Sequence, residues 1–161
     1  MCLFACDYCQ NEIRILAHMS NDPQLISLFH EDGHDIYKQM SSSVTGKPLQ
    51  EVTDKERCVS KQVTLAIIYG MGIQQVSKKL KISQSEAKTL FNKFFTRFSG
   101  VRTWINQTKD FARKNKFVLT IVGRRRYLDD ICSNDSAKRS QAERQAVNTI
   151  IQGSAADLVG A

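Results

Sequence analysis

Residues 53–70 read TDKERCVSKQVTLAIIYG. Thr53 followed three residues later by Glu56 is a capping box, a pattern typical of a helix N-terminus. Apolar residues recur at helical spacing as far as Tyr69, and Gly70 then interrupts the pattern. The segment therefore predicts a helix over residues 53–69.

One face of this helix carries a stripe with a four-residue repeat: Arg57, Lys61, Leu65 and Tyr69. Two cations followed by an apolar and an aromatic residue could hold a nucleotide, with the phosphates at one end and the base at the other. The alternative is an ordinary amphipathic helix whose basic end is solvated and whose apolar end enters the core.

The segments around this helix are also mostly helical in pattern. Further helices are expected at residues 10–19, 24–30, 35–44, 73–80, 83–98, 101–114 and 136–152, the last of them stopping at Gly153. Apolar or β-branched runs predict strands at residues 3–6 and 117–122, and a turn follows at Arg124, Arg125 and Arg126. The expected fold class is α+β, mostly α-helical, with short strands near both ends.

Composition limits the classes of protein to consider. The chain has 161 residues, 42% of them hydrophobic and 24% charged, which is typical of a globular protein rather than a disordered one. The apolar runs are far too short for a membrane span, so no membrane partner is expected. Five cysteines in a chain of this size favour a reducing compartment, cytosol or nucleus. A net charge of +7 favours an acidic partner, with nucleic acid first.

The N-terminal segment offers a candidate metal site. Asp7 ends the first expected strand and Glu12 follows in the next helix. Carboxylates held on rigid backbone suit a hard cation such as Mg²⁺. The alternative is a capping Asp and a solvated Glu.

A second interpretation of the same segment rests on Cys2, Cys6 and Cys9. Their spacing is that of radical-SAM enzymes, which bind an iron–sulfur cluster. A strand pattern runs through Cys2 and Cys6, and the chain is too short for a SAM-binding barrel, so incidental cysteines are favoured.

The last cluster lies near the C-terminus. The arginine turn 124–126 is followed by Arg139 and then by Arg144, Asn148 and Gln152 at four-residue intervals on one helix face. These residue types hydrogen-bond sugars, phosphates and base edges. The alternative is a solvated arginine turn.

In this order, the clusters resemble the polymerase domain of family A DNA polymerases, and most closely its theta/nu branch. Residues 7–14, DYCQNEIR, resemble motif A, written DYSQIELR. Residues 57–70 resemble motif B. Residues 123–128, 142–148 and 152–157 resemble the return to the palm.

The resemblance implies a role for each candidate. Asp7 would be one of two carboxylates holding the catalytic Mg²⁺ pair, and Glu12 would be the gate against a ribose 2′-hydroxyl, with Gln10 and Arg14 in the motif A surroundings. The incoming deoxynucleoside triphosphate would be bound by Arg57 and Lys61, with Leu65 against its base and Tyr69 near the templating position. Primer–template DNA would contact Arg144, Asn148 and Gln152.

Several positions depart from the family pattern. Leu65 stands where the family has Phe or Tyr, which removes ring stacking on the nucleotide. Tyr37 stands where bacterial members have a triphosphate-binding His. Smaller departures are found at Cys9, Asn11 and Asp129. The His-Asp-Glu turn of motif C, which supplies the second metal-binding carboxylate, does not occur in the 161 residues. We therefore expect this chain alone to have no polymerase activity and to bind DNA weakly, with a strong salt dependence.

The resulting expectation is a fragment of a DNA repair polymerase of the theta type, located in the nucleus. Residues 1–20 would be a palm segment, 21–116 the fingers helices and 117–161 the return to the palm. The alternative from another class is a non-catalytic DNA-binding remnant of such a polymerase.

Overall fold

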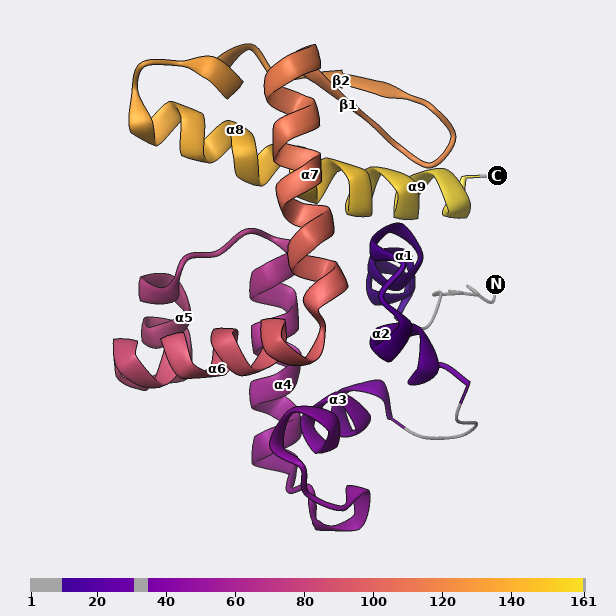
Figure 1. The fold of residues 1–161 in the computed structure, drawn as a ribbon, viewed down its shortest axis with the longest axis vertical. Coiled ribbons are helices and arrows are strands. Elements are labelled where there is room, and N and C mark those ends of the chain that lie inside the picture. Colours follow the sequence, from indigo (N-terminus) through magenta and orange to yellow (C-terminus); the bar gives the residue numbers. More distant parts are fainter. Residues whose placement is uncertain (1–9, 31–34, 161) are drawn as a thin grey trace, which may run out of the picture.

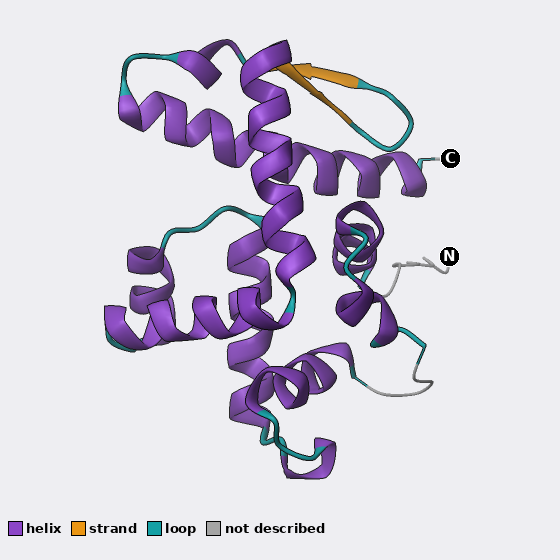
Figure 2. Cartoon of the chain, viewed as in Figure 1, coloured by secondary structure: helices purple, strands orange, loops and turns teal. Residues whose placement is uncertain are grey.

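A computed structural model of the chain describes residues 10–30 and 35–160. Helices dominate this part of the chain, and one small antiparallel hairpin lies at one end of it (Figures 1 and 2). This confirms the expected α+β, mostly helical class. The predicted strand at residues 3–6 lies outside the described residues. No helix in the described ranges is long and apolar enough to cross a membrane.

The elements follow one another along the chain with short connections. The helices are α1 (Asn11–Ser20), α2 (Pro23–Ser27), α3 (Ile36–Thr45), α4 (Asp54–Ile68), α5 (Ile73–Leu80), α6 (Gln84–Arg97), α7 (Ser99–Asn115), α8 (Ser136–Asn148) and α9 (Ser154–Val159). The strands are β1 (Phe117–Leu119) and β2 (Arg125–Tyr127). Two 3₁₀ turns, η1 (Leu49–Glu51) and η2 (Asp129–Cys132), and the π-helical turn η3 (Thr149–Gly153) complete the set.

Capping boxes start the two central helices of the fold, α4 and α6. The Thr53 hydroxyl accepts from the Glu56 backbone N–H at 3.2 Å, and the Thr53 N–H donates to the Glu56 carboxylate at 2.9 Å. Ser83 and Glu86 repeat this pattern at the start of α6. Each box satisfies N–H groups that have no partner within the helix. The predicted starts of both helices are confirmed.

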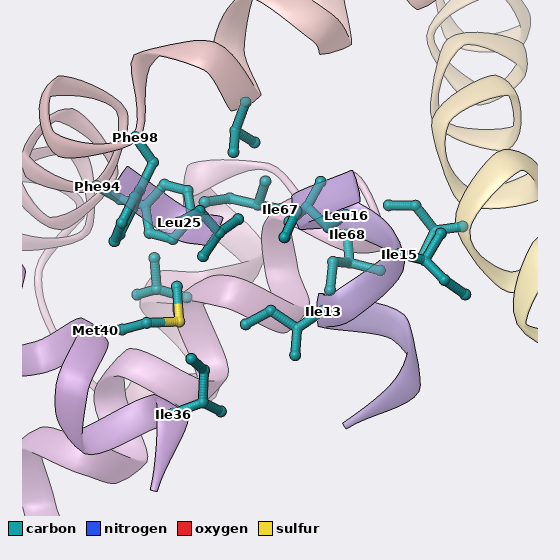
Figure 3. Packing of buried hydrophobic residues seen from close by; sticks show 14 of the residues in the cluster. Ile13, Ile15, Leu16, Leu25, Ile36, Met40, Ile67, Ile68, Phe94 and Phe98 are labelled. Atoms are coloured by element: carbon teal, nitrogen blue, oxygen red, sulfur yellow. The ribbon is translucent and has the colours of Figure 1, made fainter. Parts of the chain in front are cut away.

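The main hydrophobic core surrounds α4. Figure 3 shows apolar side chains of α1, α2, α3 and α6 gathered around Ile67 and Ile68 of α4. Leu16, Met40 and Phe98 are completely buried. The rings of Phe94 and Phe98 lie 5.0 Å apart between centroids. This packing fixes both the axis of α4 and the direction in which its polar stripe faces.

A buried carboxylate joins the first helices to α7. Asp22 is 1% exposed; its Oδ1 accepts from the Leu25 N–H at 2.9 Å and its Oδ2 from the Gly100 N–H at 2.7 Å. A Cβ atom on Gly100 would lie 2.8 Å from Oδ2, so only glycine fits this approach. Asp22 therefore caps α2 and holds the start of α7 against it.

The C-terminal region corrects two predictions. Arg125 and Arg126 belong to β2, where Arg126 pairs with Val118, so the arginine run is part of a hairpin rather than a simple turn. The final helix does not stop at Gly153; it passes through η3 and continues as α9 (Figure 1). Gly153 has a helical φ of −63°. A Cβ there would lie 2.7 Å from Cγ2 of Thr120, so this glycine admits the hairpin rather than ending the helix.

Candidate nucleotide and nucleic-acid site

Asp7 and the three N-terminal cysteines lie outside the described residues, so the metal and iron–sulfur interpretations of that segment stay predictions. Within residues 10–30 and 35–160, no group of three or more His, Cys, Asp or Glu side chains is placed to hold a metal ion. Of the two predicted carboxylates, the structure describes Glu12.

Glu12 connects the three predicted clusters. The Tyr69 hydroxyl, at the end of α4, donates to Glu12 Oε1 at 3.1 Å, and the amide of Gln152, in η3, donates to the same oxygen at 3.4 Å. Burial raises the pKa of the Tyr69 phenol, and the neighbouring Glu12 carboxylate raises it further, so Tyr69 acts as a donor at neutral pH. Tyr69 and Gln152, which lie 57 and 140 positions after Glu12 in the sequence, thus hydrogen-bond to the same carboxylate.

The basic end of the α4 stripe faces the start of α3. The Arg57 guanidinium lies 2.7 Å from Oδ2 of Asp35, the N-cap residue of α3. The Lys61 ammonium lies 5.7 Å from the centre of the Tyr37 ring, a cation–π contact. Together, Arg57 and Lys61 place two positive charges along one edge of α3.

The apolar end of the stripe opens into a hollow of about 440 Å³. Leu65 and Tyr37 line one side of it, Glu12 another, and Ala155 and Val159 of α9 a third. Gln10 also lines this hollow, with a left-handed φ of 57° at the start of α1. A cavity with an apolar wall, a carboxylate and flanking cations is suited to a nucleotide.

Arg14, the other residue expected near motif A, points elsewhere. Its guanidinium lies over the Phe29 ring at 4.9 Å from the centroid. It thus contacts the segment after α2 rather than the hollow.

The hairpin and η3 form a second, strongly basic hollow of about 330 Å³. Its lining includes the three consecutive arginines 124–126 together with Asn148 and Gln152. Arg124 donates to Asp157 Oδ1 at 2.5 Å and to the Gly153 carbonyl at 3.2 Å, and Arg126 donates to the Thr149 hydroxyl at 3.0 Å. These bonds fix the arginines in place, and such an array suits phosphate oxygens.

Arg144 lines a different hollow from Asn148 and Gln152. Its aliphatic stem covers Gly70, where a Cβ would lie 2.7 Å from Cγ of Arg144, and its guanidinium donates to the Ser140 hydroxyl at 3.0 Å. It lines a smaller hollow of about 180 Å³ with Lys109 and Glu143. Arg139 donates to the Ser133 carbonyl at 2.9 Å and so holds the loop before α8 against this helix.

Sequence reasoning missed two acidic partners of this site, Asp35 and Asp157. Asp35 could have been found as an N-cap residue, because it immediately precedes the helical pattern at 36–45. Asp157 carries no comparable signal, because its contact with Arg124 depends on α9 continuing past Gly153.

By its structural similarity to a solved polymerase domain, the fold belongs to the class of right-hand polymerases, in their fingers and palm region. A solved structure, the POL domain of Pol1 from M. smegmatis in complex with DNA primer-template and dNTP, superposes with a TM-score of 0.89 at 40% sequence identity. The match covers 95% of this chain and 27% of that one.

The sequence model of DNA polymerase family A matches residues 1–161, and this chain belongs to that family. It is 43% identical over 157 residues to DNA polymerase I of Caldicellulosiruptor bescii and 41% identical to DNA polymerase theta of Drosophila melanogaster. The match covers 98% of this chain in both cases, but 18% and 8% of those relatives.

Proposed function

We propose that this chain is the nucleotide-binding portion of a DNA-directed DNA polymerase that adds deoxynucleotides to a primer 3′ end. The observation that carries the proposal is the shared carboxylate of Glu12, which brings motif A, the α4 stripe and η3 to one place. Family membership supports the same activity.

The predicted site residues that lie within the described ranges have the following roles in this proposal. Arg57 and Lys61 neutralise the triphosphate, while Leu65 contacts the base. Glu12, held by Tyr69 and Gln152, stands beside the sugar and crowds a 2′-hydroxyl. The hollow lined by Arg124, Arg125, Arg126 and Asn148 binds the DNA backbone. Arg144, which lines a separate hollow beside Gly70, also contacts the DNA.

Chemistry would depend on metal ions. Asp7 would hold Mg²⁺ together with a second carboxylate that these 161 residues do not supply, and the metal pair would activate the primer hydroxyl and neutralise charge on the triphosphate. We therefore propose that the chain alone does not extend a primer.

The wider assignment follows the sequence resemblance. Residues 1–20 and 117–161 would belong to the palm, and 21–116 to the fingers. A theta-type role in DNA repair and a nuclear location belong to this proposal as well. The similar identities to bacterial polymerase I and to polymerase theta make the branch a matter for experiment: a nuclear location of the full-length protein would support the theta type.

Primer extension by the full-length protein that carries this chain tests the proposal. We expect extension with Mg²⁺ and deoxynucleotides, loss of incorporation with retained DNA binding in Asp7→Ala, and a raised KM for nucleotide in Lys61→Ala. Lys93→Ala, which changes an exposed lysine on α6, is the matched control. Turnover like the wild type in Asp7→Ala would contradict the motif A assignment.

A DNA-binding remnant is the second candidate, and Leu65 is the observation that favours it. This side chain lines the nucleotide hollow but offers no ring for stacking. Full-length protein that binds primer–template with a steep salt dependence but never extends it would establish this candidate.

A further inference from the structure

The carboxylate of Asp35 bridges α3 and the basic end of the α4 stripe. Its Oδ1 accepts from the backbone N–H groups of Tyr37 and Lys38 at 3.0 and 3.1 Å, so it caps α3. Its Oδ2 accepts from the Arg57 guanidinium at 2.7 Å. One side chain thus occupies both the N–H groups of a helix N-terminus and a cation, two kinds of group that bind phosphate oxygens.

A soluble anion can reach the pair of Asp35 and Arg57 and compete with Asp35 for the guanidinium. The side chains of Asp35 and Arg57 are 32% and 35% exposed, so a soluble anion can reach the pair. Lys61 lies one helical turn further along the same face, against Tyr37. The first turn of α4 carries two carboxylates: Asp54 is 94% exposed and pairs with Lys38 at 3.7 Å, and Glu56 pairs with Lys47.

Asp35 stays ionised at neutral pH. Burial alone would raise the pKa of this carboxyl, but the hydrogen bond from Arg57 and those from the backbone N–H groups of Lys38 and Tyr37 outweigh it and lower the pKa. The negative charge that holds Arg57 is therefore present throughout the physiological range.

We propose that Asp35 is an internal competitor for the triphosphate: it holds Arg57 in place of a phosphate until a nucleotide displaces it. This inference rests on the proposed function and adds a regulatory element to the same site. A triphosphate, with several charges and contacts to both Arg57 and Lys61, can break the pair. A monophosphate can bind without displacing Asp35, so the pair lowers the affinity for triphosphates more than that for monophosphates.

The cost of displacement sets the size of the effect. A partly exposed ion pair of this kind changes an equilibrium constant by up to about fivefold. The apparent affinity for nucleotide falls by the fraction of molecules in which Arg57 is free. Removing the charge of Asp35 should therefore tighten triphosphate binding by about two- to fivefold, and the gain should shrink as salt screens the pair.

Substitution with asparagine separates the charge from the helix cap. Asparagine caps helices about as well as aspartate does, so Asp35→Asn keeps the start of α3. Asp135 is a matched control within the chain: it caps α8 through the N–H groups of Ala137 and Lys138, in the same way that Asp35 caps α3. Asp135→Asn changes an equivalent charge at a helix remote from Arg57.

The experiment titrates the 161-residue chain with dATP plus Mg²⁺, and separately with dAMP, followed by calorimetry or amide chemical shifts. We expect tighter dATP binding in Asp35→Asn and no change in Asp135→Asn. We expect no gain when Asp35→Asn is combined with Arg57→Ala, and a larger ratio of dATP to dAMP affinity in Asp35→Asn. The thermal transition of each variant checks its folding, and Asp35→Ser provides a second capping substitution.

Two results would overturn the inference in distinguishable ways. If Arg57→Ala weakens dATP binding but Asp35→Asn and Asp35→Ser leave it unchanged, the nucleotide site stands and the competitor does not. If no variant binds dATP at all, or if neither Arg57→Ala nor Lys61→Ala alters binding, the nucleotide site itself is contradicted, and the competitor with it.

Discussion

The hydroxyl of Tyr69 lies 3.1 Å from Oε1 of Glu12, although 57 positions separate the two residues in sequence. The contact joins the C-terminal end of α4 to the first turn of α1. The position of Glu12, the carboxylate proposed to face the sugar, therefore depends on the position of α4.

Tyr69→Phe should weaken sugar discrimination, because it removes the donor that orients Glu12 and leaves the ring in place. One hydrogen bond of this type contributes about 0.5–1.5 kcal/mol, which corresponds to a two- to tenfold change. The measurement is the ratio of kcat/KM for deoxy- and ribonucleotides in the full-length protein. Tyr127→Phe, on an exposed tyrosine of β2, serves as the control. An unchanged ratio in Tyr69→Phe would contradict the orienting role.

Leu65→Tyr should improve nucleotide use, because it restores a ring on the wall of the hollow of about 440 Å³. An aromatic stacking contact contributes about 0.5–1.5 kcal/mol, so KM for the deoxynucleotide should fall by about two- to tenfold. Steady-state primer extension measures this change. A clear loss of efficiency would show instead that the surroundings of Leu65 are matched to leucine.

Gly100→Ala should destabilise the fold, because its new Cβ would meet Asp22 at 2.8 Å and displace the buried carboxylate that holds the start of α7. Overpacking of this kind costs about 1–3 kcal/mol. Gly72→Ala is the control, since nothing lies within 4 Å of a Cβ at that position. Denaturant unfolding of the two variants should therefore give clearly different midpoints; equal midpoints would rule out a tight contact at Gly100.

The link between α7 and α8 should weaken in acid. Glu143 pairs with Lys109 at 3.2 Å and with Arg113 at 2.7 Å. Burial opposes its ionisation, but the hydrogen bonds from Arg113 and Lys109 outweigh it and lower the pKa of Glu143 from 4.5. A carboxyl whose pKa is lower in the folded state stabilises above the unfolded value, and this contribution is lost as pH falls through the folded value.

Glu143→Gln tests this pH dependence. At neutral pH it should lower the free energy of unfolding by about 1.5–3 kcal/mol, and the difference from wild type should diminish as pH falls below 4.5. Glu51→Gln, on an exposed carboxylate of η1, should show no such convergence. If the free energies of unfolding of Glu143→Gln and wild type differ by the same amount at every pH, the ion pair does not cause the pH dependence.

The helices of the fingers region could be predicted because their signals are local. The box at Ser83 and Glu86 marks the start of α6, and α5 (Ile73–Leu80) has the predicted bounds. Side-chain hydrogen bonds to backbone N–H groups within one turn need no distant partner, so the sequence alone reveals them.

Features that depend on distant contacts could not be predicted. Gly153 resembles a helix terminator in sequence, but its role is to admit Thr120 of the hairpin. Arg144 likewise lines a different hollow from Asn148, because its stem packs on Gly70 whereas Asn148 lies beside the hairpin. In the nucleotide site, the α4 stripe was visible as a repeat, whereas the pairing of Arg57 with Asp35 required the packing of α3 on α4.

Through the π-helical turn η3, the orientation of α9 relative to α8 depends on the number of residues between them as well as on their identity. A deletion within η3 would remove the extra residue that the π-helical turn accommodates, whereas deleting one residue from the regular part of α8 would turn α9 by about 100° around its axis. Ser154, which accepts the Ile121 N–H at 2.9 Å, and Asp157, which holds Arg124, would both rotate away from the hairpin. A single missing codon in α8, with every other residue intact, would therefore be more harmful than most substitutions within α8, and more harmful than a missing codon in η3.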